Sequence, residues 1–427
     1  MNHISDLISF MDSSPVNFWA VHTCRSRLEA AGFRELDMRQ QWHLSPGDKR
    51  YVEKNGSAIF AFVVGTGTDY AFDIIAAHSD SPGFRLKPSC VIPCEGGSVK
   101  LNTEVYGGPI LYTWFDRPLS LAGRVALRSD PLQPQMRLMR VDRPLMVIPH
   151  LAIHFNRAVN EGNKLSRQKD MLPVVALDCK DPSGLIENLI SENLDIDSAQ
   201  ILDYDLSLYS CTGATTAGVE NEMVLSGRLD DLSMVHAGLT ALCDTADNPS
   251  KHTRVLAVFD NEETGSGTKQ GAGSPVLEHI LRRIVLATNG TEENFMRSVA
   301  ASFMISADNA HGLHPNYVEK FDPTNHPVLG GGPCIKVNAN CKYMTDADSA
   351  AVFRRICELA GVPCQSFVNH SDIAGGSTLG NILTSQIPLR GVDMGAPLWA
   401  MHSCCETASA ADHISTIRAF TTFYSLT

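Results

Sequence analysis

Several features that would indicate other classes of protein are missing from this chain. The amino terminus contains acidic residues but no basic region before an apolar run, so it does not resemble a secretory signal. No apolar stretch approaches the ~20 residues that are needed to span a bilayer. The 12 cysteines are scattered and form no Cys-x-x-Cys pair, which favours reduced thiols over disulfides. We therefore expect a cytoplasmic protein.

The chain also has no block of basic residues to offset its net charge of -12. This balance disfavours nucleic acid or an anionic membrane surface as a partner. An acidic substrate is not excluded, because a single local cation is enough to bind it. The length of 427 residues exceeds one typical hydrophobic core and predicts two domains.

Five short apolar runs each end in side chains that can bind a metal ion. The side chains at these ends are His78 and Asp80, Asp230 and Asp231, Glu262 and Glu263, Asp308 and His311, and His402. Such runs predict buried strands that reach the surface at their carboxyl ends. In open α/β sheets those ends converge on the ligand crevice. Imidazoles and carboxylates without cysteine are typical of a catalytic rather than a structural zinc site.

The pattern of apolar and polar residues changes twice along the chain. Residues 89–221 are rich in alternating patterns such as SVKLNTEVY, which predict strands. The flanking residues 1–88 and 222–427 mix helical and strand patterns and contain the metal-binding candidates. We therefore predict one discontinuous α/β catalytic domain, with a mixed sheet flanked by helices, that is interrupted by a β-rich insertion.

The adjacent residues Glu262 and Glu263 can take separate roles, because neighbouring residues that leave a strand point in different directions. One carboxylate would bind a metal ion and the other would act as a general base toward water. An acidic turn exposed to solvent is the alternative for this pair. Asp80 can accept the second imidazole N–H of His78, as histidine ligands usually require.

Asp230 is suited to bridging two cations, although an N-cap for the following helix would also explain the pair Asp230-Asp231. Both interpretations hold together if Asp230 is the ligand and Asp231 lies in the first turn. Together the five runs supply two ligand sets and leave Glu262 unligated. The predicted sets are His78, Asp230 and Asp308 for one cation, and Asp230, Glu263 and His402 for the other. His311 is interpreted as a pocket residue.

Several long motifs resemble the aspartyl aminopeptidases of the M18 metallopeptidase family. These motifs include AAHSDSPGFRLKP, IPHLAIHFNRAVNEG, GRLDDL, DNEETGS, SADNAHGLHPNY and AMHSCCETA, and the resemblance runs in order over nearly the whole chain. It implies a zinc-peptidase-like catalytic domain with an inserted dimerisation domain. It also implies two divalent metal ions, Zn above all with Co or Mn as alternatives, and a homo-oligomer, a dodecamer built from dimers.

The resemblance assigns roles to individual residues by matching motifs. His78, Asp230, Glu263, Asp308 and His402 would be metal ligands, with Asp80 as the residue that orients His78 and Glu262 as the base. His154 would reach the active site of a neighbouring subunit. Lys336 would bind an acidic substrate side chain, with Tyr343 beside it in the pocket.

The implied substrates are peptides with a free amino terminus, preferably beginning with Asp or Glu. Cys404 and Cys405 depart from the family pattern after the last histidine, and this change bears on substrate preference. The alternatives are a family member that prefers neutral residues, or another dimetal amide hydrolase such as a carboxypeptidase or deacylase. A catalytically silent assembly or cargo-binding shell is the non-enzymatic alternative, and the retention of Glu262 and all proposed ligands argues against it.

Overall fold

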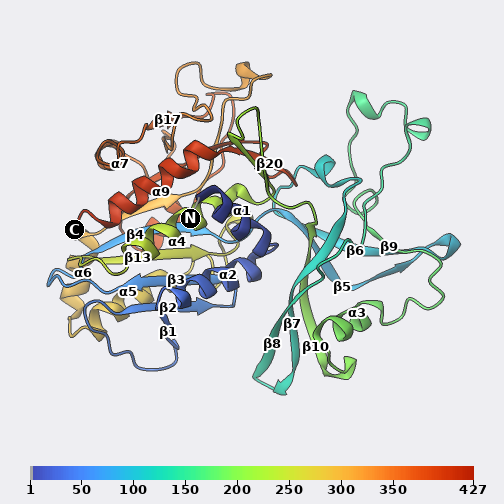
Figure 1. Cartoon of the computed structure of the whole chain (residues 1–427), viewed down its shortest axis with the longest axis horizontal. Helices are drawn as coiled ribbons and strands as arrows, with labels where there is room; N and C mark the ends of the chain where they lie inside the picture. The colour runs from blue at the N-terminus through green and yellow to red at the C-terminus, as the bar shows by residue number, and fades with distance from the viewer. Residues whose placement is uncertain (1–2) are drawn as a thin grey trace. The chain divides into compact units, whose positions relative to one another are not determined.

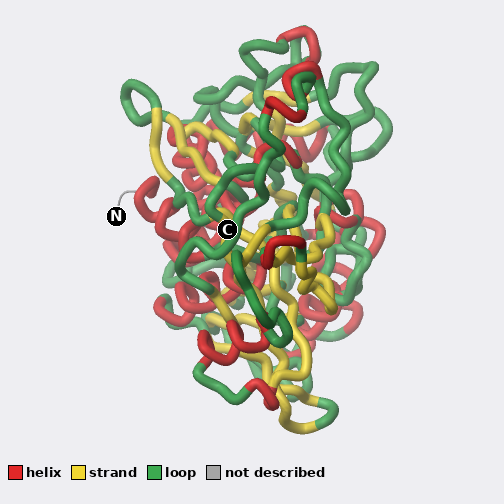
Figure 2. The backbone as a smooth tube through the Cα atoms, turned by 90° about the vertical axis from the view of Figure 1, so that its right-hand side faces the viewer, coloured by secondary structure: helices red, strands yellow, loops and turns green. Residues whose placement is uncertain are grey.

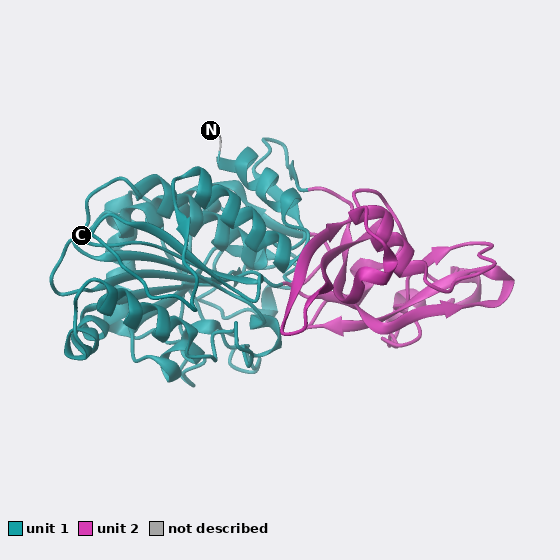
Figure 3. Cartoon of the chain, turned by 90° about the horizontal axis from the view of Figure 1, so that it is seen from below, with its two compact units in different colours: residues 1–80, 214–401, 406–427 teal, residues 81–213, 402–405 magenta. Residues whose placement is uncertain are grey.

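The computed structural model describes residues 3–427, and the chain forms two compact units (Figure 3). Unit 1 contains the chain up to Asp80 together with residues 214–401 and 406–427, and unit 2 contains residues 81–213 and 402–405. The sequence placed the boundaries eight residues later, at 88/89 and 221/222. The difference arises because β5 (Gly83–Pro93) already belongs to the sheet of unit 2, whereas β11 (Thr215–Ala217) already belongs to a sheet of unit 1.

Unit 1 is built around a nine-stranded sheet in the described part of the chain, with the order β1-β2-β3-β13-β4-β14-β18-β16-β17. Its strands are β1 (Arg34–Glu35), β2 (Lys49–Lys54), β3 (Ala58–Val63), β4 (Phe72–His78), β13 (Thr253–Phe259), β14 (Phe303–Ala307), β16 (Cys334–Lys336), β17 (Gln365–Phe367) and β18 (Arg390–Gly395). The central strands β13, β4, β14 and β18 are parallel, whereas β3 and β16 pair antiparallel to their inner neighbours. The predicted α/β class with a mixed sheet is confirmed.

Helices cover both faces of this sheet (Figure 1). They are α1 (His3–Ser13), α2 (Asn17–Ala30), α4 (Leu229–Thr245), α5 (Val276–Ala287), α6 (Glu292–Ala301), α7 (Ala347–Ala360), α8 (Leu379–Gln386) and α9 (Ala410–Tyr424). Successive residues of β4 serve the two faces in turn: Ile75 belongs to the core cluster that includes residues of α1, α2, α4, α7 and α9, and Ile74 belongs to the cluster that includes residues of α5, α6 and α8. Both faces are therefore dry, which explains why β4 and β13 are apolar along almost their whole length.

The register of the parallel strands brings the ends of the apolar runs to one edge of the sheet. His78 pairs with Phe259, the last residue of β13, so Glu262 and Glu263 follow just beyond it. Ser306 of β14 pairs with Ala76 of β4, so Asp308 lies level with His78 two residues later. The carboxyl ends of three neighbouring strands thus carry the predicted metal-binding side chains.

A second sheet of unit 1 positions the start of α4. It has the order β11-β12-β20-β19-β15, with β12 (Met223–Ser226), β15 (Ala310–His311), β19 (Pro397–Trp399) and β20 (Glu406–Ser409). The chain leaves β12 at Ser226 and enters α4 at Leu229, where Leu229 and Leu232 are fully buried. Asp230 and Asp231 are therefore held between two anchored leucines.

Unit 2 is an antiparallel six-stranded sheet with the order β8-β7-β10-β5-β6-β9. Besides β5 it contains β6 (Val99–Tyr106), β7 (Leu119–Asp130), β8 (Gln133–Arg140), β9 (Val174–Ala176), β10 (Ile201–Ser210) and the helix α3 (Leu185–Leu194). Between β8 and β9 the chain runs mainly through loops and short 3-10 turns (Figure 2). Nowhere in residues 3–427 does a helix combine the length and the apolarity that a bilayer crossing requires.

Candidate metal centre

His78 ends β4 and is almost fully buried. Its Nδ1 lies 3.0 Å from the main-chain oxygen of Asp80 and 3.4 Å from Asp80 Oδ1. These oxygens can fix the tautomer in which Nε2 carries the free lone pair. Nε2 faces Asp230, whose Oδ1 lies 3.9 Å away. The imidazole is therefore oriented toward the start of α4.

The carboxylate of Asp80 also holds the turn that carries the glutamate pair. Its Oδ1 accepts the backbone N–H of Glu262 at 3.1 Å, and its Oδ2 accepts the backbone N–H of Glu263 at 3.2 Å. Sequence reasoning gave Asp80 only the imidazole of His78 as a partner. The two bonds span more than 180 positions of sequence, so no local pattern indicates them.

Asp230 and Asp231 precede the regular part of α4. Their backbone angles are not helical, and the peptide bond between them is cis. The backbone N–H of Asp230 donates to Glu406 Oε2 at 3.1 Å. Asp231 Oδ2 accepts the backbone N–H of His78 at 3.0 Å, and no N–H of α4 in the described chain bonds to this carboxylate. Arg228 occupies the N-cap position, so neither aspartate is the N-cap, and Asp231 lies in the first turn as predicted.

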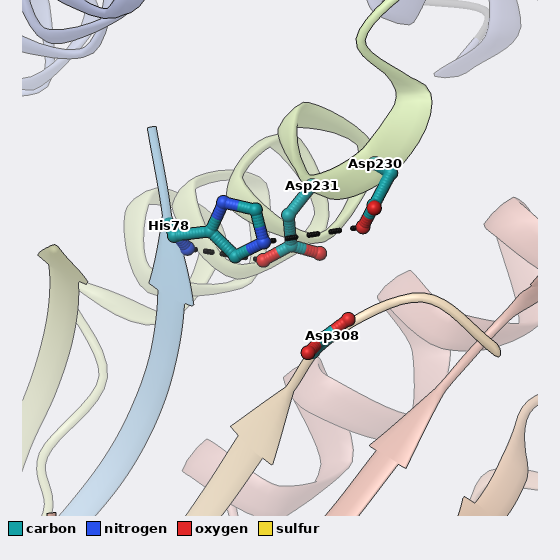
Figure 4. Close-up of side chains that lie close together, drawn as sticks. All are labelled: His78, Asp230, Asp231 and Asp308. Atoms are coloured by element: carbon teal, nitrogen blue, oxygen red, sulfur yellow. Dashed lines mark hydrogen bonds and ion pairs between the residues drawn. The ribbon is translucent and has the colours of Figure 1, made fainter. Parts of the chain in front are cut away.

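Two overlapping groups of ligand atoms lie together in unit 1. His78, Asp230, Asp231 and Asp308 each offer one atom, and these atoms lie within 4.8 Å of one another (Figure 4). The ligand atoms of His78, Glu262 and Glu263 form a second group and also lie within 4.8 Å of one another. A ligand atom of Asp230 lies within 4.8 Å of one of Glu263. The structure thus brings together the three residues predicted for the first cation and adds Asp231 to them.

The density of carboxylates perturbs their acidity. Burial raises the pKa of Glu262 to about 9; the attraction of His78 opposes this rise, and the negative charges of Asp308 and Glu263 add to it. Burial also raises the pKa of Asp231 well above its ordinary value. Burial by itself would lower the pKa of His78, but the negative charge of Asp231 and Asp80 raises it well above the ordinary value. The site is therefore deficient in positive charge.

Lys336 ends β16 on the other side of Asp308. Its side chain is 4% exposed, and Nζ lies 3.2 Å from Asp308 Oδ1. Nζ also lies 5.7 Å from the centre of the Tyr343 ring, which is buried as well. Burial by itself would lower the pKa of Lys336, but the negative charges around it, with Asp308 first, together raise the pKa, so the lysine carries its charge. An ammonium group is thus fixed beside the carboxylate cluster.

The remaining predicted residues are three histidines. His311 is exposed in β15, and its ring lies edge-on to that of Phe367. His402 belongs to unit 2, where its Nδ1 lies 3.1 Å from the main-chain oxygen of Gly108. His154 also belongs to unit 2 and lies exposed in the 3-10 turn Ile153–Phe155.

Comparison with known proteins gives one consistent family. The model of the family described as aminopeptidase I zinc metalloprotease (M18) matches residues 10–424. A probable M18 family aminopeptidase 2 of Clostridium novyi is 48% identical over 427 residues, which is 99% of this chain and 98% of the relative. A protein of the same name from Ectopseudomonas mendocina is 41% identical, with 99% and 98% covered.

Solved structures agree with this match. The chain resembles one in a cryo-EM structure of the Ape4 and Nbr1 complex with a TM-score of 0.95 and 33% identity, covering 99% of this chain and 85% of that one. It resembles mApe1 of Chaetomium thermophilum with a TM-score of 0.86 and 29% identity, covering 99% and 96%. The chain therefore belongs to the M18 family of metalloaminopeptidases.

Proposed function

We propose that this protein is a dinuclear metal-dependent aminopeptidase that removes amino-terminal residues, preferably Asp or Glu, from peptides. The observation that carries the proposal is the buried group of one imidazole and several carboxylates at the carboxyl ends of β4 and β14, with Glu262 close to it. Unit 1 would be the catalytic domain and unit 2 the dimerisation domain.

The residues fit divalent metal ions by their chemistry. Imidazole nitrogen and carboxylate oxygen suit Zn²⁺, with Co²⁺ and Mn²⁺ as alternatives. Asp231 Oδ1 is buried and has no hydrogen-bond partner in the described chain, which is costly unless positive charge is supplied. We propose His78, Asp230 and Asp308 as ligands of one ion, and Asp230, Glu263 and His402 as ligands of the other. Bound ions would polarise the scissile carbonyl and acidify a water molecule.

Glu262 is proposed as the general base. Its carboxylate would take a proton from the attacking water and deliver it to the leaving amine. A raised pKa of about 9 without ions means that nearby positive charge brings Glu262 toward the range in which it can exchange protons near neutral pH. Asp80 accepts hydrogen bonds from the backbone N–H groups of Glu262 and Glu263 and so fixes the main chain of both residues. With the main chain fixed, one side chain would bind an ion and the other would act as the base.

Lys336 is proposed to recognise the acidic side chain of the substrate. Its ammonium is buried and charged, and it lies next to Asp308, so a bound carboxylate would gain a charge-assisted hydrogen bond close to the reacting centre. Tyr343 and His311 would complete the substrate pocket, and His154 would reach the active site of a neighbouring subunit.

We further propose a cytoplasmic homo-oligomer, a dodecamer built from dimers. Light scattering should then give a mass twelve times that of one 46.4 kDa chain. A monomer in solution at assay concentration would contradict the assembly. It would also leave His154 without a neighbouring subunit to act on.

A panel of dipeptides that vary in the first residue tests the activity, with Zn²⁺, Co²⁺ or Mn²⁺ added to the metal-free protein. We expect release of the first residue, fastest for Asp and Glu, and no cleavage when the amino terminus is acetylated. Faster cleavage of Leu or Ala dipeptides would support the alternative with neutral preference. Cleavage that instead requires a free carboxyl terminus would support a carboxypeptidase, and acceptance of acetylated substrates a deacylase.

The non-enzymatic alternative makes a different prediction. A silent assembly shell would bind no metal ion after reconstitution and would cleave none of the dipeptides. Metal content measured on the same samples separates this outcome from a wrong choice of substrate. A protein that binds two ions but cleaves nothing in the panel would contradict the proposed aminopeptidase activity and leave the proposed metal centre standing.

A further inference from the structure

Asp231 is a fully buried carboxylate at the start of α4 that has an unusual set of neighbours. Its Oδ2 accepts the backbone N–H of His78 at 3.0 Å. Its Oδ1 is buried and has no hydrogen-bond partner among the described residues. Figure 4 shows one oxygen directed to the backbone nitrogen of His78 and the other turned toward the side of Asp230 and Asp308.

A purely structural role does not account for this arrangement. A buried carboxylate oxygen without a hydrogen bond is costly, and other carboxylates nearby add repulsion. One atom of Asp231 lies within 4.8 Å of ligand atoms of Asp230 and Asp308, both acids. The ammonium of Lys336 is paired with Asp308. An amide would make the bond to His78 without the cost of burying a charge, so the second oxygen of Asp231 requires another explanation.

We propose that Asp231 is a further residue of the metal centre, with a separate task for each oxygen. Oδ2 fixes the end of β4 so that His78 faces Asp230, and Oδ1 presents an additional anionic oxygen to the ion held by His78, Asp230 and Asp308. The inference rests on the proposed dinuclear function. It makes the environment of this ion richer in carboxylate than the three predicted ligands alone.

The isosteric variant Asp231→Asn separates the two tasks. The amide oxygen of Asn can still accept the N–H of His78, whereas its NH₂ group directs donors at the ion. The metal-free variant is titrated with Zn²⁺ and with Co²⁺ against a chromophoric chelator, and unfolding of the metal-free protein is followed by calorimetry. We expect one of two ions to bind ~10–100-fold more weakly, the range seen when residues around a metal site are replaced.

The stability of the metal-free protein provides the readout that distinguishes a metal-site residue from a structural one. Removing one acid from a group of buried acids relieves repulsion, so metal-free Asp231→Asn should unfold at the same temperature as the wild type or higher. Asp231→Ala should show the same loss of metal affinity and, because the N–H of His78 then loses its acceptor, a lower unfolding temperature.

Asp73→Asn is a matched control, because Asp73 is also buried and lies near the other end of the same strand, where it bonds to His252 and Thr427. It should bind both ions as the wild type does. Equal ion affinity in wild type and Asp231→Asn would overturn the inference, as would equal weakening in Asp73→Asn. If the wild type itself binds no ions, the proposed function fails instead.

Discussion

Replacing Lys336 with Met should remove most of the preference for acidic substrates. The variant keeps roughly the length of the side chain but removes the buried positive charge that is proposed to distinguish Asp from Leu in the substrate. A hydrogen bond to a charged group is worth about 1.5–3 kcal/mol. At about 1.4 kcal/mol per factor of ten, this corresponds to a loss of roughly 10- to 150-fold in kcat/KM for Asp relative to Leu.

The structure places the expected value in the lower part of this range. Burial of Lys336 strengthens its attraction for a substrate carboxylate, because little water screens the pair. Asp308 already shares the ammonium at 3.2 Å, however, and reduces the charge left for the substrate. We therefore expect roughly a 10- to 30-fold loss of discrimination.

The assay compares kcat/KM for matched Asp and Leu dipeptides in the same enzyme sample. Loss of the Lys336 partner of Asp308 can change how much metal the enzyme binds. Such a change affects kcat/KM for both substrates equally, so the ratio of the two kcat/KM values does not depend on it. Lys342→Met serves as control, because this exposed lysine lies next to Tyr343 and should leave the ratio unchanged. Equal losses on the two substrates would refute the assignment of Lys336 as the residue that reads charge.

Three further outcomes are expected. Glu262→Gln should lower kcat by ~10²–10⁴-fold while the metal content measured by mass spectrometry stays that of the wild type, and normal turnover would exclude Glu262 as the base. Chelation should abolish activity and lower the unfolding temperature, since an ion at 100 times its Kd contributes about 2.7 kcal/mol to stability, and re-added Zn²⁺, Co²⁺ or Mn²⁺ should restore both. His236 and His413 should make the fold acid-sensitive: burial lowers the pKa of both, so their contribution to stability is complete above pH 6.5 and is lost as the pH falls. The free energy of unfolding should then decrease by up to about 2.7 kcal/mol per pH unit for two protons, and His413→Gln should halve this slope in denaturant titrations.

The chemistry of the site is largely visible in the sequence because it depends on strand ends. Parallel strands that are buried on both faces must be apolar until they end, so β4, β13 and β14 can be recognised in the sequence as apolar runs. The register of these strands brings the polar residues that follow them to one edge of the sheet. His78, Glu263 and Asp308 follow from this rule without any knowledge of tertiary contacts. The unit boundaries are less visible, because the burial patterns of β5 and β11 are irregular and do not determine which sheet each strand joins.

The parts that could not be predicted depend on bonds between segments remote in sequence. Asp231 resembles an N-cap residue in the linear sequence, but its acceptor is used by His78, which lies 153 positions away. Asp80 resembles a partner of the His78 imidazole alone, yet it also accepts two N–H groups of the glutamate turn. A carboxylate can accept several hydrogen bonds. The sequence shows where the carboxylates are, but the donors that reach them are determined by the tertiary structure.

Asp80 and Asp231 together link the segments that carry the proposed ligands. Each is a buried carboxylate that accepts main-chain N–H groups of a different segment: Asp231 fixes the end of β4, and Asp80, two residues later, fixes the turn after β13. The three segments that carry His78, Asp230 and Glu263 are thereby linked in series through their backbones. The backbone positions from which these side chains extend are therefore fixed relative to one another. The negative charge of these linking carboxylates raises the cost of the empty site, and the same charge increases the affinity of the site for cations.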